Sequence, residues 1–123
     1  MMLAKDKVLV VDDEFLIVEL LSSMIEDMGL QVCGSAATAD EAAALAQQHL
    51  PALVLMDVRL RGARDGIDAA IAIHDTVGSR VIFITGSREP ETVARISLGR
   101  PTAMLFKPIL FEQLQRAVRQ ALA

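Results

Sequence analysis

The chain of 123 residues has the usual length of one domain, and we expect residues 1–123 to form a single domain. Its formal net charge is −4 at pH 7 and it carries no stripe of lysine and arginine, which argues against nucleic acid as a direct partner. No apolar run approaches the ~20 residues that cross a bilayer and no secretory leader opens the chain, so we expect a cytoplasmic protein without a membrane partner.

Five short apolar stretches alternate with five segments of helical periodicity. The strands are predicted at residues 7–11, 31–36, 53–57, 80–85 and 103–106. The helices are predicted at residues 14–28, 38–49, 67–76 and 90–98, and from about residue 110 onward. Strict alternation of this kind is typical of a parallel sheet with right-handed crossovers and helices on both faces. We therefore predict an α/β fold of three layers.

Several helix boundaries carry sequence signals. Asp13 can cap the first helix, and Gly29 is placed to end it. Thr38 and Glu41 have the spacing of a capping box at the start of the second helix. Pro90 suits the first turn of the fourth helix, because the N–H that proline lacks has no partner inside a helix at that position.

Polar side chains follow four of the five predicted strands. These residues are Asp12, Asp13, Asp57, Thr85 and Lys107. The carboxyl ends of parallel strands lie at one edge of a sheet, so three carboxylates, a hydroxyl and an ammonium should converge there. Carboxylates that close repel one another unless a cation joins them. Mg²⁺ fits best, because it prefers hard oxygen ligands, whereas zinc would favour histidine or cysteine.

This set of groups suits phosphoryl transfer. Asp57 is placed to attack as a carboxylate nucleophile and form an acyl phosphate. Thr85 could donate a hydrogen bond to one phosphoryl oxygen while Lys107 pairs with another. Each residue also has a plainer interpretation: Asp13 as a helix cap, Thr85 as an ordinary strand residue and Lys107 as a solvated loop residue. Their joint occurrence at one sheet edge favours the functional interpretation.

The motifs that carry these residues resemble the receiver domain of two-component response regulators. They are VLVVDDE at 8–14, LMD at 55–57, DG at 65–66, TG at 85–86 and KP at 107–108. The resemblance covers essentially the whole chain, in order and in spacing. It implies a flavodoxin-like, doubly wound sheet of five strands in the order 2-1-3-4-5, flanked by five helices, with the site between the first and third strands.

The resemblance also implies a role for each residue. Asp57 matches the phosphoacceptor of the family. Thr85 matches its switch hydroxyl, and Lys107 matches the lysine that the family characteristically has after the fifth strand. The carboxylates of Asp12, Asp13 and Asp57 would hold Mg²⁺, together with the backbone carbonyl of Arg59. A histidine kinase or a histidine phosphotransferase protein would donate the phosphoryl group.

The chain departs from the family pattern at three places. Arg61 stands where the loop after the acceptor usually has proline, and Asp65-Gly66 arrives one residue later than usual. Met104 replaces the aromatic residue that couples the family's switch hydroxyl to its interaction surface. A flexible methionine could repack in its place, but a plain core methionine is the favoured interpretation.

Further residues should border the site. Gly86 leaves room for a phosphoryl group or an attacking water, and Arg59 and Ser87 flank the same space. We expect Arg59 and Ser87 to influence the rate of dephosphorylation. A cis peptide bond at Pro108 is common in the family and plausible for any bond that precedes proline.

Two functions are consistent with these residues. The first is a phosphorylation-controlled signalling switch, which catalyses its own aspartyl phosphorylation and slow autodephosphorylation without being a turnover enzyme, and which acts on an unidentified downstream protein. The second is a receiver-like adaptor that acts without phosphorylation. A turnover aspartyl phosphatase is disfavoured, because the chain has Arg59 at the position where such an enzyme would need a general acid. Flavin binding is disfavoured, because no phosphate-cradling loop follows the first strand. Apolar residues of the last elements are compatible with a homodimer or with a core.

Overall fold

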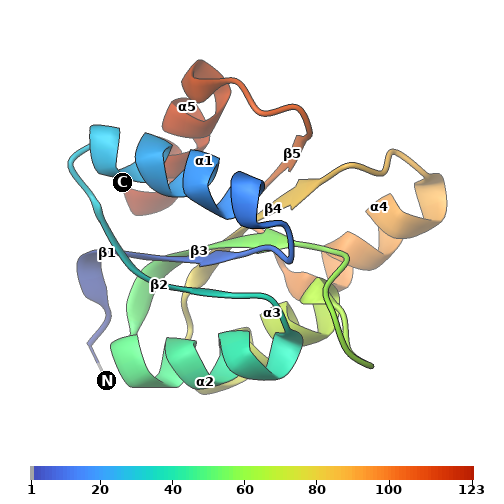
Figure 1. The fold of residues 1–123 in the computed structure, drawn as a ribbon. Coiled ribbons are helices and arrows are strands. Elements are labelled where there is room, and N and C mark those ends of the chain that lie inside the picture. Colours follow the sequence, from blue (N-terminus) through green and yellow to red (C-terminus); the bar gives the residue numbers. More distant parts are fainter. Residues whose placement is uncertain (1) are drawn as a thin grey trace.

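The apolar stretches form one sheet of five parallel strands in the computed structural model, which describes residues 2–123 (Figure 1). The strand order β2-β1-β3-β4-β5 confirms the predicted doubly wound topology. The strands are β1 (Ala4–Val11), β2 (Gln31–Ala36), β3 (Pro51–Asp57), β4 (Arg80–Thr85) and β5 (Ala103–Phe106). The helices are α1 (Phe15–Asp27), α2 (Ala39–His49), α3 (Gly66–Thr76), α4 (Pro90–Ile96) and α5 (Phe111–Leu122), and the 3₁₀ turn η1 (Ser97–Gly99) follows α4.

Two hydrophobic clusters cover the two faces of the sheet. In β3, Val54 and Met56 pack in the cluster that contains the buried residues of α2 and α3. Leu53 and Leu55 pack in the other cluster, with buried residues of α1 and α5. Figure 1 shows α1 and α5 on one face of the sheet and α2 and α3 on the other. Because both faces are covered, the strand reads as a continuous apolar run rather than as an alternating one. None of the helices within residues 2–123 is long and apolar enough to cross a membrane.

The predicted helix caps are only partly correct. Gly29 has φ +82° and follows Met28, the C-cap residue of α1, as expected of a glycine that ends a helix. The Thr38 hydroxyl oxygen accepts a hydrogen bond from the Glu41 N–H at 3.1 Å, which confirms the Thr38 cap. The predicted capping box is only half formed, because Glu41 Oε1 accepts from the Ala37 N–H at 2.9 Å and not from Thr38. The capping role predicted for Asp13 is wrong, because Glu14 occupies the N-cap position of α1 and makes no side-chain cap. Instead Asp12 Oδ1 accepts from the Glu14 N–H at 2.9 Å.

The start of α3 is fixed by a capping box that the sequence analysis missed. Asp65 Oδ1 accepts hydrogen bonds from the N–H groups of Ile67 and Asp68, both at 3.0 Å. Asp68 Oδ2 accepts in return from the Asp65 N–H at 3.0 Å. The next residue, Gly66, donates its N–H to the Val58 carbonyl at 2.7 Å. A Cβ atom on Gly66 would overlap the carbonyl oxygen of Asp57, so α3 approaches the end of β3 this closely only with glycine there.

This close approach predicts that Gly66→Ala destabilises the protein by about 1 to 3 kcal/mol or more, the usual effect of overpacking against a backbone that cannot move aside. Urea unfolding monitored by circular dichroism measures the change. Gly34→Ala in β2 is the matched control, since its Cβ would make ordinary contact with Leu45 at 3.7 Å. Equal midpoints for Gly66→Ala and the wild type would contradict the prediction.

Candidate functional site

Three carboxylates meet at the carboxyl edge of the sheet, as predicted. Asp12 follows β1 and Asp57 ends β3, and these two strands pair side by side up to Val11 and Met56. One carboxylate oxygen from each of Asp12, Asp13 and Asp57 lies within 4.8 Å of the others. Asp12 and Asp57 are only 2% and 6% exposed, so little water remains to screen their charges.

Lys107 bridges the two buried carboxylates. Its Nζ donates to Asp12 Oδ2 at 3.1 Å and lies 3.4 Å from Asp57 Oδ2. The backbone positions this side chain, because the Lys107 N–H donates to the Thr85 carbonyl at 2.8 Å. This hydrogen bond continues the pairing of β4 with β5 as far as the site. The Lys107–Pro108 peptide bond is cis, as the family resemblance suggested.

The charges of the site are unevenly balanced. Burial and the neighbouring charge of Asp12 raise the pKa of Asp57 to about 6, against the opposing effect of Lys107. Burial favours the neutral form of Lys107, but its hydrogen bond to Asp12 and the charges of Asp57 and Asp12 outweigh burial and raise the pKa of its ammonium. One ammonium therefore faces three carboxylates, and the site can accept more positive charge.

The donor set fits a divalent metal ion with hard ligand preferences. All three side chains of the cluster offer carboxylate oxygens, and two of them are buried. Mg²⁺ is typically held by one or two carboxylates and keeps several of its waters, which an open, acidic site permits. The cluster of Asp12, Asp13 and Asp57 could thus hold a metal ion.

A cavity of about 750 Å³ opens over the carboxylates and is lined in part by Arg59, Thr85, Gly86, Ser87 and Lys107. Thr85 is 2% exposed. Its Oγ1 accepts a hydrogen bond from the Ser87 N–H at 3.1 Å. The structure thus brings together the residues that the sequence placed around the site.

Met104 lies apart from this cavity. It is half-buried in β5 and packs against the hydrophobic cluster on the side of α2 and α3. Phe106, two residues further along β5, is stacked by Arg88, whose guanidinium carbon lies 4.0 Å from the ring centroid.

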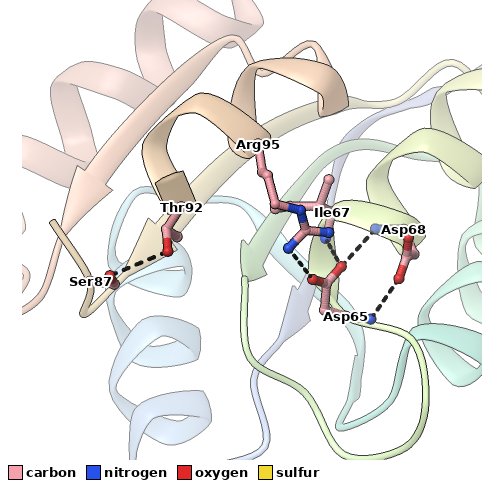
Figure 2. A network of polar contacts seen from close by, with 6 residues as sticks. All are labelled: Asp65, Ile67, Asp68, Ser87, Thr92 and Arg95. Carbon is pink, nitrogen blue, oxygen red and sulfur yellow. Dashed lines mark hydrogen bonds and ion pairs between the residues drawn. The ribbon is translucent and has the colours of Figure 1, made fainter. Parts of the chain in front are cut away.

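Two further residues of the cavity wall, Asp65 and Arg95, were not assigned to the site from the sequence, although Asp65 belongs to one of the family motifs. Arg95 Nη1, on α4, donates to Asp65 Oδ2 at 2.9 Å (Figure 2). Burial would raise the pKa of Asp65, but the N–H of Asp68 and the guanidinium of Arg95 outweigh it and hold that pKa below its usual value. The spacing of Asp65 and Asp68 could have indicated the cap. The sequence contains no signal for the contact of Asp65 with Arg95, because 30 residues separate them.

Fold and site together are those of a receiver domain. The family model of the response regulator receiver domain matches residues 8–119, and the chain belongs to this family. It is 34% identical over 117 residues to the transcriptional regulatory protein PdtaR of Mycobacterium tuberculosis, covering 95% of this chain and 57% of that protein. It is 32% identical over 117 residues to the phyllosphere-induced regulator PhyR of Methylorubrum extorquens, covering 94% of this chain and 43% of that protein. The chain thus spans about half the length of these curated relatives.

Solved structures agree with this assignment. The signal receiver domain of a modulated diguanylate cyclase from Desulfovibrio desulfuricans superposes with a TM-score of 0.89 at 32% identity, covering 94% of this chain and 92% of that one. The receiver domain of PhyR from Erythrobacter litoralis superposes with a TM-score of 0.84 at 32% identity, covering 95% and 89%. Both comparisons extend over nearly the whole sheet and its helices.

The raised pKa of Asp57 predicts how stability depends on pH in the metal-free protein. Because the native state binds this proton more tightly than the unfolded state, its contribution to stability is fully present below pH 3.8 and is lost as the pH rises through about 6. Asp57→Asn should therefore stabilise the metal-free protein at pH 7.5, by about 1 to 3 kcal/mol at ~1.4 kcal/mol per pKa unit, and give little gain at pH 3.5.

Urea unfolding in the presence of a chelator, at both pH values, tests this expectation. The exposed residue Asp75 provides the control variant Asp75→Asn, which should leave stability nearly unchanged at either pH. Identical free energies of unfolding for Asp57→Asn and the wild type at pH 7.5 would show that burial of the Asp57 carboxylate costs nothing.

Proposed function

We propose that residues 1–123 act as a single receiver domain, which accepts a phosphoryl group on Asp57 from a phosphohistidine and thereby changes its protein-interaction surface. The donor is a histidine kinase or a histidine phosphotransferase protein, and the recipient of the signal is a downstream protein. One observation supports this most strongly: buried Asp57 shares its pocket with two further carboxylates and with the Lys107 ammonium. Family membership supports it independently.

In the proposed reaction a carboxylate oxygen of Asp57 attacks the phosphorus of the phosphohistidine. The new O–P bond forms as the N–P bond breaks, and the imidazole leaves with the electron pair of that bond. The product on this chain is an acyl phosphate. Carboxylates of Asp12, Asp13 and Asp57, with the backbone carbonyl of Arg59, would hold Mg²⁺, which supplies positive charge against the phosphoryl oxygens when bound.

Thr85 and Lys107 are suited to bind the transferred group. The Thr85 oxygen already accepts from the Ser87 N–H, so its own proton remains free for a phosphoryl oxygen in the cavity. The Lys107 ammonium has three donors and lies 3.4 Å from Asp57 Oδ2. A phosphoryl group on that carboxylate would place further oxygens within reach of the ammonium.

The chain is proposed to catalyse its own phosphorylation and slow autodephosphorylation only. Two residues after Asp57, where a general acid would serve a turnover phosphatase, the chain has Arg59, and arginine is not among the side chains that usually serve as general acids. Loss of the phosphoryl group therefore depends on the access of water through the cavity.

A receiver-like adaptor that needs no phosphorylation is the second candidate. Met104 favours it, because the family's aromatic switch residue is absent there and Met104 itself packs against the core. The complete set of Asp12, Asp13, Thr85 and Lys107 around Asp57 favours the phosphorylated switch.

Incubation with Mg²⁺ and a small phosphodonor separates the two candidates. We expect intact-protein mass spectrometry to show the addition of one phosphoryl group in the wild type and none in Asp57→Asn. A chelator should abolish the addition, because the three carboxylates then lack the cation that offsets their charge. Asp75→Asn, at an exposed position of α3, should be modified like the wild type. A wild type that gains no mass while remaining folded would favour the adaptor.

The phosphoryl lifetime should depend on Arg59 and Ser87, which line the cavity over Asp57. Truncation of either side chain alters the path and orientation of the attacking water, and we expect Arg59→Ala and Ser87→Ala each to change the dephosphorylation rate by about 2- to 10-fold, that is by roughly 0.4 to 1.4 kcal/mol of barrier. Loss of the phosphoryl mass after removal of the donor measures the rate. Arg80→Ala, an exposed substitution at the start of β4, is the control, and unchanged rates in both test variants would refute this role.

A further inference from the structure

Helix α4 is only weakly anchored to the rest of the molecule. Of its seven residues, all within the described part of the chain, Ile96 alone is buried. Its N-cap residue, Glu89, makes no side-chain cap. An element with so little buried apolar surface can change position at small cost in free energy. Even weak polar contacts along its inner side can therefore shift the position that the helix prefers.

Two such contacts connect α4 to the phosphorylation site (Figure 2). At one, Thr92 Oγ1 lies 3.5 Å from the hydroxyl oxygen of Ser87, whose N–H donates to Thr85. At the other, Arg95 pairs with Asp65 at 2.9 Å. The second contact is charged and joins α4 to the N-cap of α3.

Asp65 in turn is firmly connected to the acceptor. Its capping hydrogen bonds fix the first turn of α3. The adjoining Gly66 lies against the carbonyl oxygen of Asp57. The side chains of Arg95, Asp65 and Asp57 all line the same cavity, so a charge added to Asp57 acts on the ion pair across a short, partly enclosed space.

We propose that Arg95 is a positioning residue, which holds α4 against Asp65 in the unphosphorylated protein and is drawn away from Asp65 when Asp57 carries a phosphoryl group. This inference rests on the proposed function. The phosphoryl group brings a charge of about −2 and three acceptor oxygens into the cavity, whereas Asp65 offers a single charge. A guanidinium matches phosphoryl oxygens in geometry as well as in charge.

Arg95 suits this role better than the other arginines of the cavity. Arg88 stacks on Phe106, and Arg59 belongs to the loop that follows β3. The Arg95 side chain is 52% exposed, and an exposed ion pair stabilises a structure only slightly, so a competing anion can displace it. A contact that weak gives an equilibrium that phosphorylation can shift.

Hydrogen exchange of α4 tests the proposal. Peptides that cover residues 87–98 are compared before and after modification of Asp57 by a small phosphodonor with Mg²⁺, or by beryllofluoride as a phosphoryl mimic. In the wild type we expect exchange at residues 93–96 to become roughly two- to fivefold faster, the range that the loss of an exposed ion pair allows. Mass spectrometry of the same samples records whether Asp57 is modified.

Three variants isolate the ion pair. Arg95→Gln should exchange fast at α4 already before modification and gain little after it, whereas Arg95→Lys, which keeps the charge, should retain the response. Asp65→Asn keeps an oxygen to cap α3 but loses the charge that binds Arg95, so it should behave like Arg95→Gln, and the double variant should show no additional effect. Arg119→Gln, at an exposed position of α5, should match the wild type.

The possible failures are distinguishable. If Asp57 is modified but exchange at α4 is unchanged or slower, or if Arg95→Gln responds like the wild type, the role of Arg95 is refuted and the proposed function stands. If neither the wild type nor Arg119→Gln gains a phosphoryl group at Asp57, the proposed function fails, and with it this inference.

Discussion

The ammonium of Lys107 holds together two buried carboxylates that would otherwise repel each other. It reaches Asp12 at 3.1 Å and Asp57 at 3.4 Å from a residue whose backbone is bonded to the end of β4. The carboxyl ends of β1, β3 and β4 are thereby held around one positive charge. Because that charge is shared between two carboxylates and a third, that of Asp13, lies close by, the site can still take up a cation.

The strand order makes this arrangement possible. β1 and β3 are neighbours although α1, β2 and α2 separate them in the chain, so Asp12 and Asp57 follow adjacent strands. Helices cover both faces of the sheet, and the apolar residues just before each carboxylate are fully buried. The burial that stabilises the domain also raises the pKa of Asp57, because it disfavours the charged carboxylate. The free energy gained by burying apolar residues in the core therefore offsets the cost of burying the charged groups of the site.

The sequence predicted those parts of the molecule that depend on local pattern. Strand positions, their order along the chain and the convergence of Asp12, Asp57 and Lys107 followed from apolar runs that end in polar residues. The prediction for Asp13 failed because two adjacent acidic residues offer equivalent caps, and only the path of the backbone shows that Asp12 bonds to the Glu14 N–H. The pairing of Arg95 with Asp65 depends on where α4 lies, which local sequence does not encode.

Met104 bears on how the proposed phosphorylation of Asp57 would change the surface of the domain. An aromatic switch residue acts through volume, because a ring must enter or leave a space next to the switch hydroxyl. Met104 instead packs in the hydrophobic cluster beside α2 and α3, where a change in its rotamer need not move α4. A charged contact acts over a longer distance but only where salt and water screen it weakly. Arg95 and Asp65 both border the cavity over Asp57, so a charge added to Asp57 would act on their ion pair over a short distance, and because Arg95 is 52% exposed the pair is weak enough to be displaced.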